Sequence, residues 1–296
     1  MSEFDPRYGE AVALAPQIAR LTAPNSGPFT GAGTNTYLLG ADEVMVVDPG
    51  PALPAHVAAI VKALRGRRVS HILITHTHCD HVDGLPSLQR AVDAPTVAEG
   101  VHREARALKE GEVNPFLKSA DTAFVPDIVL ADGDELTNGD VTVTAIATPG
   151  HTANHMAFAV GDDCLTGDHV MGWSTTVIAP PDGEMSAYLA SLDRLLEADH
   201  TRYLPAHGGG IAEPRKAVSA MRSHRLLRER AILERVNAGD RSIPAVVDAL
   251  YHGIDPRLRM AAGLSVQAHL EKLESDGRVR ASGIGAAATW LPTGVG

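Results

Sequence analysis

The chain has 296 residues, of which 44% are hydrophobic, enough for one large domain or for one domain with a small appendix. Its two cysteines, Cys79 and Cys164, exclude a disulfide framework and are typical of a reducing cytoplasm. No apolar run reaches the ~18 residues that a membrane span needs, and residues 1–10 lack the pattern of a signal peptide. We therefore expect a cytoplasmic protein with no membrane partner.

The net charge of -10 is unevenly distributed along the chain. Residues 1–214 hold 13 Lys and Arg against 28 Asp and Glu, a net -15, whereas residues 215–296 hold 13 against 8, a net +5. This change in composition predicts a domain boundary, which we place between residues 1–212 and 213–296. A polyanion, if one binds, is expected on the basic second part.

The first part of the chain predicts many short strands with a few helices between them. Strands are expected over residues 11–21, 34–39, 43–50, 72–74, 95–98, 124–130, 141–147, 156–160, 164–166 and 203–207. Helices are expected over residues 54–64, 84–91, 101–109 and 185–198. Such a mixture is typical of an α/β fold in which two sheets pack together and helices cover their outer faces.

The second part predicts three helices followed by two strands. The helices are expected over residues 213–237, 242–251 and 257–275, and the strands over 279–282 and 288–291, about a glycine-containing turn at 283–285. Ser242 is the expected N-cap of the second helix, and Pro244 fits its first turn. This order of elements resembles a winged-helix module.

The most informative stretch lies at the end of the expected strand 72–74. His76, His78, Asp80 and His81 follow that strand within six residues. Alternation along an extended chain sends His76 and His78 to the same side. Imidazoles and a carboxylate are the ligands that Zn²⁺ or a similar divalent ion prefers. The stretch therefore predicts one part of a metal site, which needs further ligands from other segments.

Three further candidate ligands each stand in a turn after an expected strand. They are His151 in Pro-Gly-His-Thr, Asp168 in Thr-Gly-Asp and His207 in Pro-Ala-His-Gly. Taken singly, each also fits a structural role, as a turn residue, a cap or a surface histidine.

The His-x-His-x-Asp-His pattern at 76–81, followed in order by these three contexts, resembles the metallo-β-lactamase superfamily over residues 30–212. The resemblance implies a four-layer αββα sandwich with metals at one edge, between the sheets. It also implies how the ligands divide: one ion takes His76, His78 and His151, a second takes Asp80, His81 and His207, and Asp168 bridges the two.

The resemblance further implies two divalent ions, for which we expect Zn²⁺, with iron and manganese as alternatives. A hydroxide bridging the ions would be the nucleophile. Asp80 would orient it and help to move its proton. His155 is a candidate leaving-group acid, with a structural role as the alternative. Asp48 matches an upstream aspartate that holds the histidine loop without binding metal.

The segments 33–40 and 173–177 resemble one branch, the β-lactamase-like protein 2 group, close to the hydroxyacylglutathione hydrolases. We therefore expect a dinuclear hydrolase of a small thioester or ester. One alternative is a metal-dependent endoribonuclease that acts on single-stranded RNA and holds it on the basic module. A nucleic acid partner is disfavoured, since the catalytic part is acidic and the arginines fall on several helix faces. Another alternative is a winged-helix binding protein with a structural metal centre.

Overall fold

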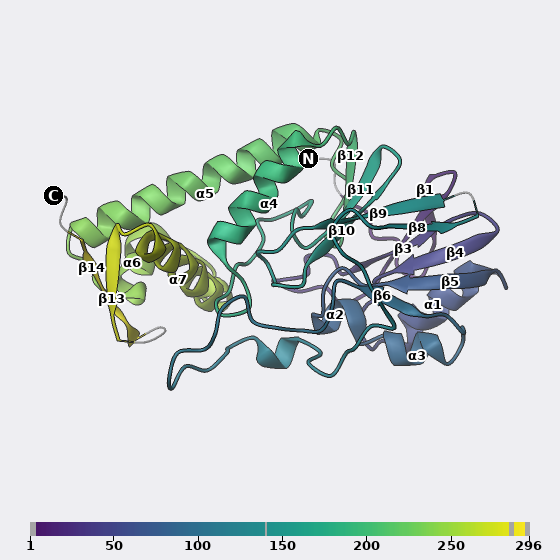
Figure 1. Ribbon diagram of the computed structural model, residues 1–296, viewed down its shortest axis with the longest axis horizontal. Coiled ribbons are helices and arrows are strands. Elements are labelled where there is room, and N and C mark those ends of the chain that lie inside the picture. The colour runs from purple at the N-terminus through teal and green to yellow at the C-terminus, as the bar shows by residue number, and fades with distance from the viewer. Residues whose placement is uncertain (1–3, 140, 284–286, 294–296) are drawn as a thin grey trace.

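Two β-sheets packed face to face form the body of the protein (Figure 1). The computed structural model describes residues 4–139, 141–283 and 287–293. The first sheet has its strands in chain order, antiparallel from β1 to β4 and parallel from β4 to β7. These strands are β1 (Val12–Ala15), β2 (Ile18–Thr22), β3 (Asn35–Leu39), β4 (Glu43–Val47), β5 (Arg68–Leu73), β6 (Thr96–Ala98) and β7 (Ile128–Val129).

The second sheet has the strand order β12-β11-β10-β9-β8. Its neighbours are antiparallel except for β11 and β12, which run parallel. The strands are β8 (Glu135–Asn138), β9 (Val141–Ala147), β10 (Met156–Val160), β11 (Asp163–Gly167) and β12 (Arg202–Pro205).

Helices cover the outer face of each sheet, which completes four layers. On the first sheet lie α1 (Pro54–Leu64) and α3 (Leu85–Gln89), and on the second lies α4 (Met185–Glu197). Strand β4 shows how alternation builds the layers, because Val44 and Val46 pack towards α1, while Met45 and Val47 pack between the sheets with Phe158. The expected α/β sandwich is therefore confirmed.

A helical module with its own core follows the sandwich. It consists of α5 (Pro214–Asn237), α6 (Ile243–Leu250), a 3₁₀ turn (Pro256–Leu258), α7 (Arg259–Ser275), β13 (Val279–Ser282) and β14 (Thr289–Pro292). The strands form an antiparallel hairpin. Val246 of α6, Leu270 of α7 and Trp290 of β14 are among the buried residues of the module's core. Ser242 caps α6 as expected, since its side chain accepts a hydrogen bond from the N–H of Ala245. Residues 284 and 285 of the expected turn lie outside the described residues.

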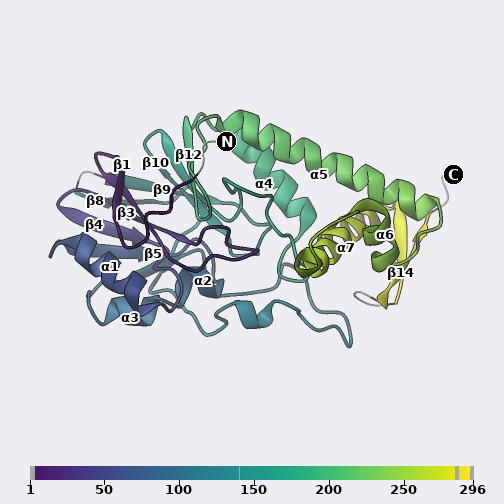
Figure 2. The same ribbon diagram turned by 180° about the vertical axis from the view of Figure 1, so that it is seen from behind.

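The long helix α5 joins the two parts (Figures 1 and 2). It packs on α4 of the sandwich, then runs on to contact α6, α7 and β14 of the module. The boundary between residues 212 and 213 stays a prediction. None of the helices in the described ranges combines the length and the apolar character that crossing a lipid bilayer requires.

Two expected strands differ in the structure, and in both a proline explains the difference. The expected strand 11–21 is a hairpin of β1 and β2, because Pro16 and Gln17 form the turn between them. In the expected strand 124–130 only Ile128–Val129 is extended in a ladder, since Pro126 has no N–H to donate. Strand β8 was not predicted, because Leu136 is its only large apolar side chain.

The helix expected over residues 101–109 was wrong, and the segment is irregular. Contacts with other parts of the chain hold it instead. The Ala105 N–H donates to the Pro181 carbonyl at 2.8 Å. The Arg106 guanidinium makes hydrogen bonds with both Glu112, within the same loop, and Glu271 of α7. These contacts outweigh the local helical propensity.

Candidate metal centre

The expected ligands meet at one edge of the sandwich, between the two sheets. Strand β5 ends at Leu73, and the chain continues through His76 and His78 into the short helix α2 (Cys79–Val82), which carries Asp80 and His81. From the second sheet, His151 follows β9, Asp168 follows β11 and His207 follows β12. Each of the seven residues therefore stands just beyond the end of a strand, as the sequence predicted.

The first triad consists of His76, His78 and His151. The Nδ1 atom of His78 lies 2.9 Å from Nε2 of His76 and 3.0 Å from Nε2 of His151. Their ligand atoms are close enough for a single metal ion. This triad has the composition that the resemblance implied for the first ion.

The second triad consists of Asp80, His81 and His207. The Oδ2 atom of Asp80 lies 3.5 Å from Nε2 of His81 and 3.3 Å from Nε2 of His207. These ligand atoms too are close enough to hold one ion. This triad has the composition implied for the second ion.

Asp168 lies between the triads and turns one oxygen towards each. Its Oδ2 is 3.6 Å from Nε2 of His151. Its Oδ1 is 3.2 Å from Nε2 of His207 and 3.5 Å from Nε2 of His81. A carboxylate in this position could bridge two cations.

Hydrogen bonds to the ring nitrogens that point away from His78 fix the tautomers of the other two rings of the first triad, His76 and His151. The Thr75 hydroxyl donates to Asp48, so at 3.1 Å it accepts from Nδ1–H of His76. Nδ1–H of His151 donates to the Val177 carbonyl at 2.7 Å. Both rings therefore carry their hydrogen on Nδ1 and direct the Nε2 lone pair at His78.

The second triad is fixed in the same way. Nδ1–H of His81 donates to Oδ2 of Asp48 at 2.8 Å, and Nδ1–H of His207 donates to the Gly33 carbonyl at 3.1 Å. Nε2 of His81 and Oδ1 of Asp168 are buried but have no hydrogen-bond partner. A buried polar atom without a hydrogen-bond partner is costly, and a cation among these atoms would satisfy them, so the donor set fits divalent metal ions.

The two triads differ in electrostatics. Burial, reinforced by the neighbouring imidazoles, lowers the pKa of His78 to about 3. Burial opposes charge on His81 as well, but the Asp80, Asp168 and Asp48 carboxylates raise the pKa of His81 to about 9. Burial alone would raise the pKa of Asp168, yet the His207 and His81 imidazoles hold it well below its usual value. The second triad is therefore the more negative environment and the stronger attraction for a cation.

The Asp48 carboxylate holds the loop that carries His76, His78 and His81 through hydrogen bonds to Thr75 and His81. Asp48 follows β4 with φ 51°, in the left-handed region that few residues other than glycine adopt. Its Oδ1 accepts from the Thr75 N–H at 2.8 Å, and its Oδ2 accepts from the Thr75 hydroxyl at 2.7 Å and from His81. This contact set agrees with the role expected for Asp48.

His155 supports Asp168 in a comparable way. The side chain is 1% exposed. Its Nε2 accepts from the Asp168 N–H at 3.1 Å, so its Nδ1–H donates to the Thr148 hydroxyl at 2.8 Å. With both nitrogens engaged and the ring buried, His155 has no free proton to give to a substrate. The geometry favours the structural alternative over the leaving-group acid.

A pocket of about 360 Å³ opens above the triads. His78, Asp80, His151, Asp168 and His207 line it. Its walls come from residues that no motif indicated, among them Phe29, Phe116, Lys118, Met171 and Asp182. Cys79 also lines this pocket, and burial raises the pKa of its thiol to about 12.

The chain belongs to the metallo-beta-lactamase superfamily, whose family model matches residues 29–207; a second model, the beta-lactamase associated winged helix domain, matches residues 242–290. A Drosophila melanogaster protein described as "Beta-lactamase-like protein 2 homolog" is 32% identical over 92% of this chain and 94% of that protein. An Emericella nidulans "Atrochrysone carboxyl ACP thioesterase" is 26% identical over 98% of this chain and 89% of that one.

Among solved structures, a metallo-beta-lactamase family protein from Thermus thermophilus superposes with a TM-score of 0.77 at 25% identity, over 95% of this chain and 100% of that chain. The predicted family, the fold and the winged-helix module are thereby confirmed. The chain is an enzyme, a metal-dependent hydrolase of this superfamily. The alternative of a binding protein that has only a structural metal centre is set aside.

Proposed function

We propose that this protein is a dinuclear hydrolase of small thioesters or esters that acts in the cytoplasm. The observation that carries the proposal is the Asp168 carboxylate, which turns one oxygen towards each of two ligand triads. Two divalent ions there would supply Lewis acidity and lower the pKa of a bound water. Five imidazoles and two carboxylates favour Zn²⁺, with iron and manganese as the alternatives.

Asp80 is the residue that we propose for proton transfer. It lines the pocket, and its Oδ2 lies in the second triad. The Thr34 hydroxyl donates to that oxygen at 2.9 Å, which fixes the carboxyl plane. A carboxylate held in this way can orient an attacking water and accept its proton. His155 is a positioning residue in this proposal, since it acts on the Asp168 backbone.

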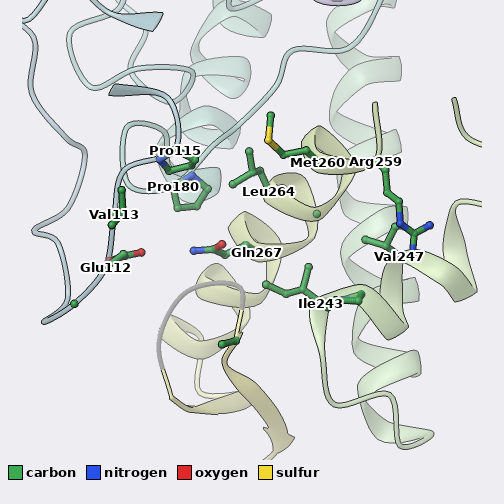
Figure 3. A pocket seen from close by; sticks show the side chains of 14 residues that line it. Glu112, Val113, Pro115, Pro180, Ile243, Val247, Arg259, Met260, Leu264 and Gln267 are labelled. Carbon is green, nitrogen blue, oxygen red and sulfur yellow. The ribbon is translucent and has the colours of Figure 1, made fainter. Parts of the chain in front are cut away.

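A second pocket, of about 560 Å³, supports a substrate with an apolar part (Figure 3). Pro115 and Pro180 lie together on one side of it, and Ile243 of α6 lies on the other. Their chain neighbours Phe116 and Ala179 line the pocket above the triads, so the same two segments form a wall of both pockets. We propose that the acyl part of the substrate lies in this second pocket, between the sandwich and the module.

Filling the second pocket tests where the acyl part lies. Gly263 of α7 lines it, and a Cβ added there would meet Ile243 at an ordinary 3.6 Å. We expect Gly263→Leu to reduce the ratio of kcat/KM for a decanoyl thioester to that for an acetyl thioester by about tenfold. Ala220→Leu, on the exposed side of α5, is the matched control. An unchanged ratio in Gly263→Leu would place the acyl part elsewhere.

The structure gives little support to the ribonuclease alternative. Five arginines of the module each face a carboxylate: Arg222 pairs with Asp193, Arg230 with Glu234, Arg235 with Asp240, Arg257 with Asp255 and Arg259 with Asp248. These pairs neutralise locally much of the positive charge that a phosphate backbone would need.

The deciding experiment combines metal analysis with a substrate panel. The full-length protein is loaded with Zn²⁺, Fe²⁺ or Mn²⁺, the bound ions are counted, and turnover of acyl thioesters, lactones and single-stranded RNA is compared with and without a chelator. We expect two ions per chain and a thioester or ester turnover that the chelator abolishes. One ion per chain, or chelator-sensitive cleavage of RNA alone, would overturn the proposal.

A further inference from the structure

The segment Thr176–Val177 contacts His151 of the first triad and Asp168, the candidate bridge. The Val177 carbonyl accepts the Nδ1–H of His151 at 2.7 Å. The Thr176 hydroxyl donates to the Asp168 carbonyl at 2.5 Å. Two neighbouring residues thus determine the ring orientation of one candidate ligand and the backbone position of the candidate bridge.

This segment is in turn held from the C-terminal module. Arg225 of α5 donates from Nη2 to the Thr176 carbonyl, which belongs to the peptide that joins Thr176 to Val177. Its Nη1 donates to the Ser265 hydroxyl of α7 at 3.3 Å. The guanidinium therefore links two helices of the module to the segment that supports Asp168 and His151.

The surroundings of Arg225 are unusual for an arginine. The residue is 3% exposed, and none of the described carboxylates lies within 4.0 Å of its guanidinium. Its neighbours are neutral acceptors and the ring of Tyr188, whose centroid lies 5.3 Å from Cζ. Burying a cation without an ion pair is costly, and an apolar side chain of similar length would be cheaper here. Stability alone does not explain an arginine at this position.

We infer that Arg225 is a positioning residue of the metal centre, through which the C-terminal module holds the Thr176–Val177 segment and thereby orients His151 and Asp168. The inference rests on the proposed function, because it assumes that those two residues bind metal. Outer contacts of this kind tune affinity by orienting the ligands. The module is then part of the scaffold of the site, in addition to lining a substrate pocket.

The two ions should respond unequally to the loss of this contact. His151 belongs only to the first triad, whereas His81 and His207 are held by Asp48 and Gly33 of the sandwich. Loosening Thr176–Val177 should therefore weaken the ion in the first triad more than the ion in the second.

The test is metal binding by full-length Arg225→Met, which removes the charge but keeps the length of the side chain. Zn²⁺ affinities are measured by competition with a chromophoric chelator, and the Co²⁺-substituted protein is followed by its visible absorption. We expect one of the two Zn²⁺ affinities to fall about 10- to 100-fold, with the smaller loss at the other, and the Co²⁺ bands to change. Neither readout depends on activity.

Arg222→Met is the matched control, because Arg222 lies one turn earlier on α5 and pairs with Asp193 on the surface. Its metal affinities and Co²⁺ spectrum should match the wild type. Thr176→Val removes the hydroxyl contacts with the Asp168 and His169 carbonyls and keeps the backbone carbonyl that Arg225 contacts, and it serves if Arg225→Met does not fold. A folded Arg225→Met, or Thr176→Val in its place, with wild-type affinities and spectrum would overturn the inference. A wild type that binds fewer than two ions would overturn the proposed function instead.

Discussion

The two ligand triads stand side by side, yet different parts of the molecule hold them. The second triad rests on the first sheet, since Asp48 follows β4 and supports His81, while Gly33 precedes β3 and supports His207. The first triad is held from that sheet only indirectly, through Thr75 and His76, and it depends as well on a loop of the second half, through the contact of Val177 with His151. One support is a strand end in a packed sheet, and the other is an irregular segment fastened by α5.

This difference teaches that two similar ion sites need not be equally rigid. Asp80 gives the second triad a carboxylate of its own, whereas the first has three imidazoles and only a share of Asp168. We therefore expect the second triad to bind its ion more tightly and to be less sensitive to changes in the module.

The largest effect is expected from the residue that the triads share. Asp168→Ala removes an oxygen from both sites, so we expect metal affinity and thioester turnover each to fall by more than the ~100-fold that an outer contact can cost. The sandwich should still fold, because the Asp168 side chain is not part of its apolar core. Metal analysis and circular dichroism check this, and full occupancy of both sites in the variant would contradict the bridging assignment.

A smaller, selective effect is expected from Asp48→Asn. The amide can still accept from the Thr75 N–H, but its NH₂ group cannot accept from His81 or from the Thr75 hydroxyl. We expect the affinity for the second ion to fall about 10- to 100-fold and that for the first ion to change less. Asp127→Asn is a matched control, since Asp127 makes similar bonds to Thr96 away from the site. An equal fall in affinity for both ions would contradict the expected difference in how the two triads are held.

The smallest effect is expected from Arg106, whose hydrogen bonds to Glu271 of α7 also link the module to the segment beside the pocket. The Arg106 hydrogen bonds hold the pKa of Glu112 below its usual value. Because the pKa of Glu112 is lower in the folded protein than in the unfolded chain, its interaction with Arg106 stabilises the folded state at pH values above the unfolded pKa of about 4.3. This stabilisation is lost as the pH falls through the folded pKa. Arg106→Gln should therefore be less stable than the wild type by about 1 kcal/mol at pH 7, with the difference shrinking at acidic pH. Urea unfolding at several pH values measures it, and a difference that stays constant down to pH 3 would contradict the assignment.

The sequence predicted the seven residues that meet at the edge, because each follows a strand whose apolar pattern is visible in the chain. The supports could not be predicted so readily. Asp48 was found because it also ends a strand and belongs to a known pattern. The support from Thr176, Val177 and Arg225 was not predicted. Arg225 and Thr176 are only 49 positions apart, but their contact depends on how α5 lies across the sandwich, which no sequence pattern shows.

The segment 101–119, irregular except for a 3₁₀ turn at Leu117–Ser119, was the least predictable part of the site. Its sequence favours a helix over 101–109, but the Arg106 bonds to Glu112 and Glu271 hold another conformation. The contact with Glu271 joins residues 165 positions apart, which no local pattern reveals. The pocket wall at Phe116 and Lys118 therefore appeared only in the structure.

The packing of α5 on α4 has a consequence for deletion experiments. Val218 of α5 and Ala268 of α7 share a buried cluster with Tyr188 and Leu192 of α4. A protein shortened at residue 212 would bare that apolar surface and leave the Thr176 carbonyl without its arginine. Lost activity in such a fragment would then reflect aggregation or a loosened site as readily as a missing recognition module, so point substitutions are the more informative way to ask what the C-terminal part contributes.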